Sequence, residues 1–119
     1  MTAISDIALA IRKRRFPLHD EKQLQKEIGE ALASIIQGGT LSREFVLDRN
    51  NIIDFFVDPG IGIEVKIKGS KRDIFRQCTR YCQFDIVKSL ILITNLSMGF
   101  PEQINGKDCY VIKLGTAWL

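Results

Sequence analysis

Three residues that could perform metal-dependent chemistry stand close together in the sequence. Asp54 is followed ten residues later by Glu64-Val65-Lys66, and the stretches that carry them are rich in β-branched and aromatic residues. Two carboxylates supply the hard oxygen ligands that suit Mg²⁺ or Mn²⁺, and a lysine can stabilise a developing negative charge. This combination predicts phosphodiester hydrolysis, in which Asp54 and Glu64 hold the ion and Lys66 positions or polarises the attacking water.

The connection between the two stretches decides whether these side chains meet. Residues two apart on a strand share a face, so Glu64 and Lys66 point the same way. A three-residue loop, 59–61, would set Asp54 opposite Lys66 and Phe56 opposite Glu64, and would bring the three functional groups to one face. A two-residue loop would turn Glu64 to the other face. We therefore predict an odd-length connection or an equivalent bulge.

A helix before these strands offers a further acid. It is predicted from Asp20, which can cap its start, to about residue 37, before Gly38-Gly39. At about 100° per residue, Glu21 lies roughly 40° from the centre of the apolar stripe, closer than the other acids of the helix. Glu21 is thus the acid expected to face the sheet, although a charge in the first turn of a helix is also favourable by itself.

A second amphipathic helix is predicted from the capping box at Ser70 to about Phe84. Gln77 and Tyr81 fall together at one edge of its buried stripe, four residues apart and within reach of each other. They either form a satisfied polar edge of the core or orient the lysine, a water or a phosphate. Arginines project outward from this helix, and the candidate contacts to nucleic-acid phosphates are Lys68, Lys71, Arg72, Arg76 and Arg80.

The composition fits one α/β domain covering residues 1–119, with 1–16 as a basic helical extension. The chain has 45% hydrophobic and 26% charged residues, and its net charge of +3 permits a polyanionic partner without demanding one. The run Arg12–Arg15 is either a solvated surface or an arm that contacts phosphates. A first short helix is expected at about 3–11, and strands at about 42–48, 51–58, 61–68, 87–94 and 109–114, the first three as an antiparallel meander.

The cysteines and the first residues indicate a cytoplasmic protein. Cys78, Cys82 and Cys109 form an odd set that fits a reducing compartment, and all three read as small buried apolar residues. A zinc site would have to add His19 to Cys78 and Cys82, but no paired CxxC knuckle supports one. The segment 1–10 fits neither a signal peptide nor a membrane span.

Taken together, the chain resembles the PD-(D/E)XK nuclease superfamily, whose pattern is an acid on one strand and Glu-x-Lys on the next in an αβββαβ core. Asp54 and Glu64-Val65-Lys66 fit this pattern across about residues 20–94, and Gln77 to Tyr81 resembles the QxxxY motif of the RecB-type branch. Ile53 stands where the pattern has proline. Among members of the superfamily, the chain is similar to the small VRR-type nucleases and Holliday-junction resolvases.

The resemblance implies a restriction-endonuclease-like fold with a central mixed sheet flanked by helices. It also implies a Mg²⁺- or Mn²⁺-dependent nuclease acting on branched DNA or DNA ends in replication, repair or recombination. A homodimer would be needed to cut a junction, and neither a membrane nor a small-molecule cofactor is implied. The implied metal site comprises Glu21, Asp54, Glu64 and Val65, and the implied catalytic residues are Asp54, Glu64, Lys66, Gln77 and Tyr81.

Two other interpretations remain open at this point. The same scaffold could be a non-catalytic nucleic-acid-binding or assembly domain that keeps the charged pocket without turnover. Alternatively, Glu64 and Lys66 could form an ion pair on an exposed face of an ordinary α/β domain. That last interpretation predicts polar neighbours, whereas the intervening residues of the strand are apolar and Gly62 is expected to leave open space beside Glu64.

Overall fold

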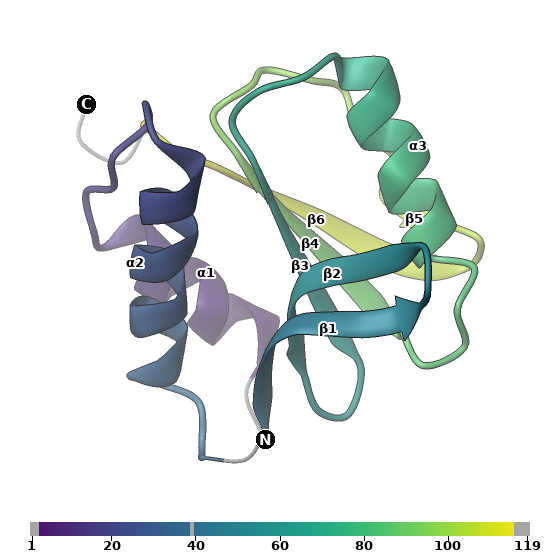
Figure 1. The fold of residues 1–119 in the computed structure, drawn as a ribbon, viewed down its shortest axis with the longest axis horizontal. Coiled ribbons are helices and arrows are strands. Elements are labelled where there is room, and N and C mark those ends of the chain that lie inside the picture. Colours follow the sequence, from purple (N-terminus) through teal and green to yellow (C-terminus); the bar gives the residue numbers. More distant parts are fainter. Residues whose placement is uncertain (1–2, 39, 116–119) are drawn as a thin grey trace.

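The computed structural model describes residues 3–38 and 40–115 as a mixed α/β fold. Six strands form one sheet in the order β1-β2-β3-β4-β6-β5, and helices flank the sheet (Figure 1). The α/β class and the mixed sheet are therefore confirmed. The predicted domain spans 1–119, and its residues 1–2, 39 and 116–119 lie outside the described part.

The sheet combines an antiparallel meander with parallel strands. The meander consists of β1 (Leu41–Asp48), β2 (Asn51–Val57) and β3 (Ile61–Lys66), as predicted. β4 (Ser89–Thr94) is parallel to β3, and β6 (Lys107–Lys113) is parallel to β4. The predicted loop between these last two strands contains a further short strand, β5 (Gln103–Ile104), which pairs with the start of β6. The central strands β3 and β4 are buried on both faces, which explains their continuous apolar sequence.

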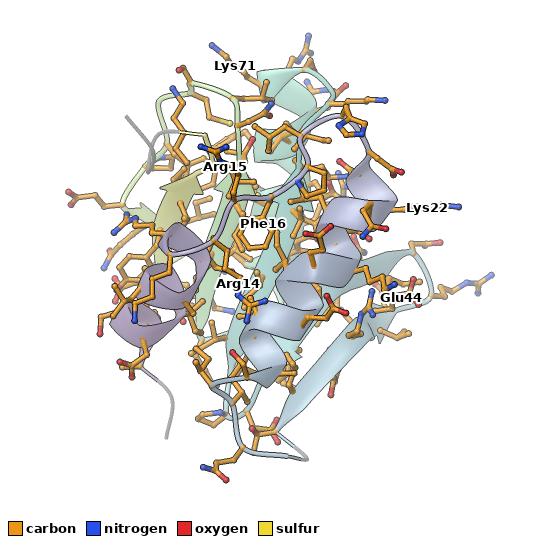
Figure 2. The ribbon with its side chains drawn as sticks, turned by 90° about the vertical axis from the view of Figure 1, so that its left-hand side faces the viewer. Arg14, Arg15, Phe16, Lys22, Glu44 and Lys71 are labelled. Carbon is orange, nitrogen blue, oxygen red and sulfur yellow. The ribbon has the colours of Figure 1, made fainter. Side chains whose placement is uncertain are left out.

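Helices cover both faces of the sheet. α1 (Ile4–Arg12) and α2 (Glu21–Ala33) lie on one face, and α3 (Lys71–Tyr81) lies on the other (Figure 1). The first face buries alternate residues of β3 and β4 against α1 and α2, and Phe16 lies between these two helices (Figure 2). The second face packs α3 against the intervening residues of β4 and against β2. The core therefore has two layers, one on each side of β3.

The starts of α2 and α3 are confirmed, but these two helices end earlier than predicted. The Asp20 carboxylate accepts hydrogen bonds from two backbone N–H groups of the first turn of α2, and Ser70 accepts one from Asp73 N–H. α2 stops four residues before the predicted position because the chain turns at Ser34, which lets Ile36 return to the core. α3 likewise stops at Tyr81, where Cys82 begins a turn towards β4.

The connection between β2 and β3 has odd length, as predicted, but its register differs from the predicted one. Val57 pairs with Ile61, so the loop is 58–60 and Phe56 stands opposite Gly62 instead of Glu64. The physical reason is a contact with the next strand: the Gly60 carbonyl accepts hydrogen bonds from the N–H groups of Lys88 and Ser89, which fixes Gly60 in the loop. The register differs from the predicted one by two residues, so each side chain still points to the face of the sheet that was predicted for it.

The space predicted beside Glu64 does not exist. A Cβ atom on Gly62 would lie 2.6 Å from Cδ1 of Ile53, so this isoleucine fills the place of the missing side chain. The glycine therefore serves close packing of β2 against β3.

The three cysteines are free and buried, as predicted. The Sγ atoms of Cys82 and Cys109 are 3.9 Å apart under the end of α3. Burial raises the pKa of the Cys78 thiol to about 12. In residues 3–38 and 40–115, no helix is long and apolar enough to cross a membrane.

Candidate active site

The site lies where β2 and β3 separate. Their regular pairing extends to Phe55 opposite Ile63, and one residue further the carboxylates take over the backbone hydrogen bonds. Asp54 N–H donates to Glu64 Oε1 at 3.2 Å, and Val65 N–H donates to Asp54 Oδ2 at 2.8 Å. Since buried backbone groups need partners, the two side chains are held in the gap between the strands. Asp54 and Glu64 thus meet, as predicted.

The backbone of β1 is irregular next to the place where β2 and β3 separate. Glu44, in the middle of β1, has a φ of 51°, an uncommon value for a residue with a side chain. The pairs on either side of it join Arg43 to Phe55 and Phe45 to Ile53, which places Glu44 opposite Asp54. The backbone irregularity of β1 therefore coincides with the position where β2 leaves β3.

Glu64 is the buried acid of the site. It is 2% exposed and lies on the α3 face of β3, where Oε2 is 3.7 Å from Lys66 Nζ and 3.3 Å from the Tyr81 hydroxyl. The Lys66 side chain is 26% exposed and reaches from the site towards solvent. The interpretation as an ion pair on an exposed face is therefore wrong, because the carboxylate of the pair is inside the protein.

The two carboxylates are short of positive charge. Burial, and then the negative charge of Asp54, raises the pKa of Glu64 to about 8. Burial also raises the pKa of Asp54, against the opposing effects of Val65 N–H and the Lys66 charge. Burial and the repulsion between the two carboxylates therefore favour an extra proton on the metal-free pair. A divalent cation placed between the carboxylates would favour their ionised forms and so displace this proton.

α3 supplies the hydrogen bonds that orient Glu64. Gln77 Nε2 donates to the Tyr81 hydroxyl at 2.7 Å, as the predicted four-residue spacing requires. The hydroxyl in turn lies 3.0 Å from the Ile52 carbonyl and 3.3 Å from Glu64 Oε2, and can donate to either oxygen. Burial raises the pKa of the Tyr81 phenol, so it stays protonated and remains a donor. Gln77 and Tyr81 therefore hold the Glu64 carboxylate from the helix side.

α2 reaches the site from the other face of the sheet. Glu21 points to the sheet as predicted: Oε1 accepts a hydrogen bond of 3.2 Å from Ile67 N–H, and its charge contributes to the raised pKa of Asp54. Gln25, one turn further along α2, places Nε2 3.5 Å from Asp54 Oδ1. Sequence reasoning missed Gln25, although its four-residue spacing from Glu21 was a usable signal.

The donor atoms fit a hard cation. Within the described ranges, no group of three or more His, Cys, Asp and Glu side chains is arranged to hold a metal ion, and the zinc set of His19 with Cys78 and Cys82 is not formed. The Asp54 and Glu64 carboxylates together provide oxygen ligands only. Mg²⁺ is commonly bound by one or two carboxylates, with water and substrate phosphate completing its octahedral shell. The pair is therefore compatible with Mg²⁺ or Mn²⁺.

The predicted phosphate contacts form an exposed basic surface on the α3 side. Four of the five basic residues belong to α3, and Lys68 precedes it. Lys71 is the first residue of the helix and lies at one end of the molecule (Figure 2). The guanidinium Nε of Arg80 donates to Asn51 Oδ1 at 3.2 Å, which ties the end of α3 to the start of β2. All five side chains are exposed: Lys68, Lys71, Arg72, Arg76 and Arg80.

Comparison of the chain with models of protein families, with characterised proteins and with solved structures finds no match. The chemistry of the site therefore has to be inferred from its own residues. Their arrangement can bind a divalent cation at paired carboxylates, place a lysine ammonium beside it, and present a cationic surface to a polyanion.

Proposed function

We propose that the protein is a Mg²⁺-dependent nuclease that hydrolyses DNA phosphodiester bonds. The observation that carries the proposal is the buried Glu64 carboxylate, held against Asp54 in the gap between two strands with Lys66 alongside. Two acids held together with one lysine beside them are short of positive charge, and this supports a cation that belongs to the site. The order α2-β1-β2-β3-α3-β4 supports a PD-(D/E)XK enzyme with a restriction-endonuclease-like core.

The acids of the site would bind the metal ion, and the lysine would act on the phosphate. Asp54 and Glu64 would hold the ion together with the Val65 carbonyl, and Glu21 lies near enough to influence Asp54. When bound, Mg²⁺ supplies Lewis acidity at the phosphate and lowers the pKa of a coordinated water. Lys66 would place its positive charge beside the attacked phosphate, where negative charge develops.

Gln77, Tyr81 and Gln25 position the carboxylates. Gln77 and Tyr81 fix the orientation of Glu64 from one face of the sheet, and Gln25 contacts Asp54 from the other. A carboxylate held in one rotamer binds a cation without first having to lose conformational freedom.

DNA would approach over α3. The exposed cations of this helix lie on the side of the sheet that also carries Glu64 and Tyr81, so phosphates bound there stay close to the site. A single domain of this size offers a small recognition surface, and a homodimer would present two sites to a branched substrate.

The proposal is tested by incubating the protein with end-labelled linear, flapped and four-way-junction DNAs in Mg²⁺, Mn²⁺ or EDTA. Cleavage should need the metal and should be abolished by Lys66→Ala. Lys22→Ala is the matched control, because this lysine extends away from the protein on α2 (Figure 2) and should leave cleavage unchanged.

Metal-independent cleavage, or full activity of Lys66→Ala, would contradict the proposed chemistry. Binding of these DNAs without cleavage in either metal would support the non-catalytic nucleic-acid-binding domain instead. In that case Lys66→Ala would alter affinity alone.

A further inference from the structure

An exposed aromatic pair lies beside the basic surface of α3. Phe75 is 39% exposed, and its ring meets that of Phe100 edge to face, with 6.0 Å between the ring centroids and an interplanar angle of 75°. Phe100, in the segment between β4 and β5, is half-buried and packs against the core under α3. Phe75 is therefore held by a neighbour that is itself anchored, while much of its ring faces water.

The positions around the helix place cations between this pair and the candidate active site. At about 100° per residue, Arg72, Arg76 and Arg80 lie roughly 60°, 100° and 140° from Phe75, all in the same direction. Gln77, which faces the site through Tyr81, lies beyond them at roughly 160° from Phe75 the other way round. The outer surface of α3 thus leads from the site across three arginines to the aromatic pair.

The charge next to Phe75 is favourable for a polyanion. Lys71 precedes Phe75 by four residues, so the two are neighbours on the helix surface. The acid of α3, Asp73, lies roughly 160° from Phe75 in the direction of the arginines, between Arg80 and Gln77, so it is far from the ring. A phosphate backbone on this surface therefore meets cations next to the exposed ring.

We propose that Phe75, supported by Phe100, stacks on an unpaired base of single-stranded DNA whose phosphates lie along Lys71, Arg72 and Arg76. An aromatic ring among cations is the arrangement by which proteins hold single strands, since every base offers a π face and every linkage a charge. The bases of a duplex are already stacked and cannot use the ring. The selected ligand is therefore a strand, or a DNA end or branch, with unpaired bases.

This inference deepens the proposed function, and its role in cleavage rests on that function. The binding itself needs neither the metal nor turnover. Affinity is therefore measured in EDTA, by fluorescence anisotropy of a short labelled thymidine oligonucleotide. An abasic oligonucleotide of the same length and charge and a blunt duplex serve as comparison ligands.

The thymidine strand should bind about tenfold more tightly than the abasic strand, because stacking on an aromatic side chain contributes about 1–3 kcal/mol per base. Phe75→Leu keeps an apolar side chain against Phe100 and should lose about the same factor for the thymidine strand, with little change for the abasic one. Tyr110→Leu is the matched control: Tyr110 is 40% exposed but lies beside α1 on the opposite face of the sheet.

Three results would overturn the inference. They are equal affinity for the thymidine and abasic strands, wild-type affinity of a folded Phe75→Leu variant, and an equal loss in Tyr110→Leu. Circular dichroism and the unfolding temperature establish that each variant is folded. If the wild-type protein binds the strand through Phe75 but cleaves nothing, the proposed catalysis fails and the binding surface stands.

Discussion

Replacing Glu64 by glutamine should stabilise the metal-free protein at alkaline pH, although the side chain is buried. The pKa of this carboxyl is raised from 4.5 to about 8, because burial and the Asp54 charge disfavour its ionised form. A group whose folded pKa is raised stabilises the fold fully below its unfolded pKa. That stability is lost as the pH rises through the folded pKa. The wild-type protein should therefore lose stability between about pH 4.5 and 8.

The magnitude follows from the same values. Each tenfold change in the ionisation equilibrium is worth about 1.4 kcal/mol, so ionised Glu64 costs the folded state about 5 kcal/mol. Glutamine stays neutral at every pH. Its one oxygen can accept from Asp54 N–H while its NH2 group faces the Tyr81 hydroxyl, which can donate to the Ile52 carbonyl. The advantage of Glu64→Gln over the wild type should therefore grow by several kcal/mol between pH 5 and pH 9, which raises the unfolding temperature by more than about 10 °C.

The assay is urea denaturation in EDTA across this pH range, followed by circular dichroism. Asp58→Asn is the matched control for the loss of a carboxyl group, because Asp58 is an exposed acid just after β2. A difference between Glu64→Gln and the wild type that stays constant with pH would refute the electrostatic description of the site.

Other predictions concern the cation, the phenol and the basic surface. Mn²⁺ binding near pH 7 should release close to one proton, which calorimetry in buffers of different ionisation enthalpy measures. Asp54→Asn should weaken Mn²⁺ binding. Binding without proton release would count against a metal site at Glu64. Tyr81→Phe should lower kcat about tenfold with little change in KM, because the substitution removes the hydroxyl that lies 3.3 Å from Glu64 Oε2. An unchanged kcat would show that Tyr81 does not position Glu64. Replacing Arg72, Arg76 and Arg80 by glutamine should reduce the salt dependence of duplex binding by about 2–3 in slope, and an unchanged slope would place the DNA elsewhere.

Local periodicity was sufficient to predict much of the site. The two-residue repeat of a strand puts Glu64 and Lys66 on one face, and the four-residue repeat of a helix joins Gln77 to Tyr81. The angle of about 100° per residue also predicted correctly that Glu21 faces the sheet. These relations hold within one element, so they do not depend on how elements pack.

What the sequence did not reveal depends on contacts between elements. The register of β2 against β3 is set by Gly60 bonding to the start of β4, and no pattern within the hairpin encodes that contact. The opening between the strands accompanies a backbone irregularity at Glu44 on a third strand. The contact of Gln25 with Asp54 depends on how α2 packs against the sheet, which the sequence of α2 alone does not specify.

The pairing of Asp54 and Glu64 around a divalent cation is tested most directly by crystals of the protein grown with Mn²⁺ and measured at the manganese absorption edge. We expect an anomalous difference peak between the two carboxylates, and its loss in Asp54→Asn. A manganese peak elsewhere with none at these side chains, or the same peak in the variant, would contradict the assignment.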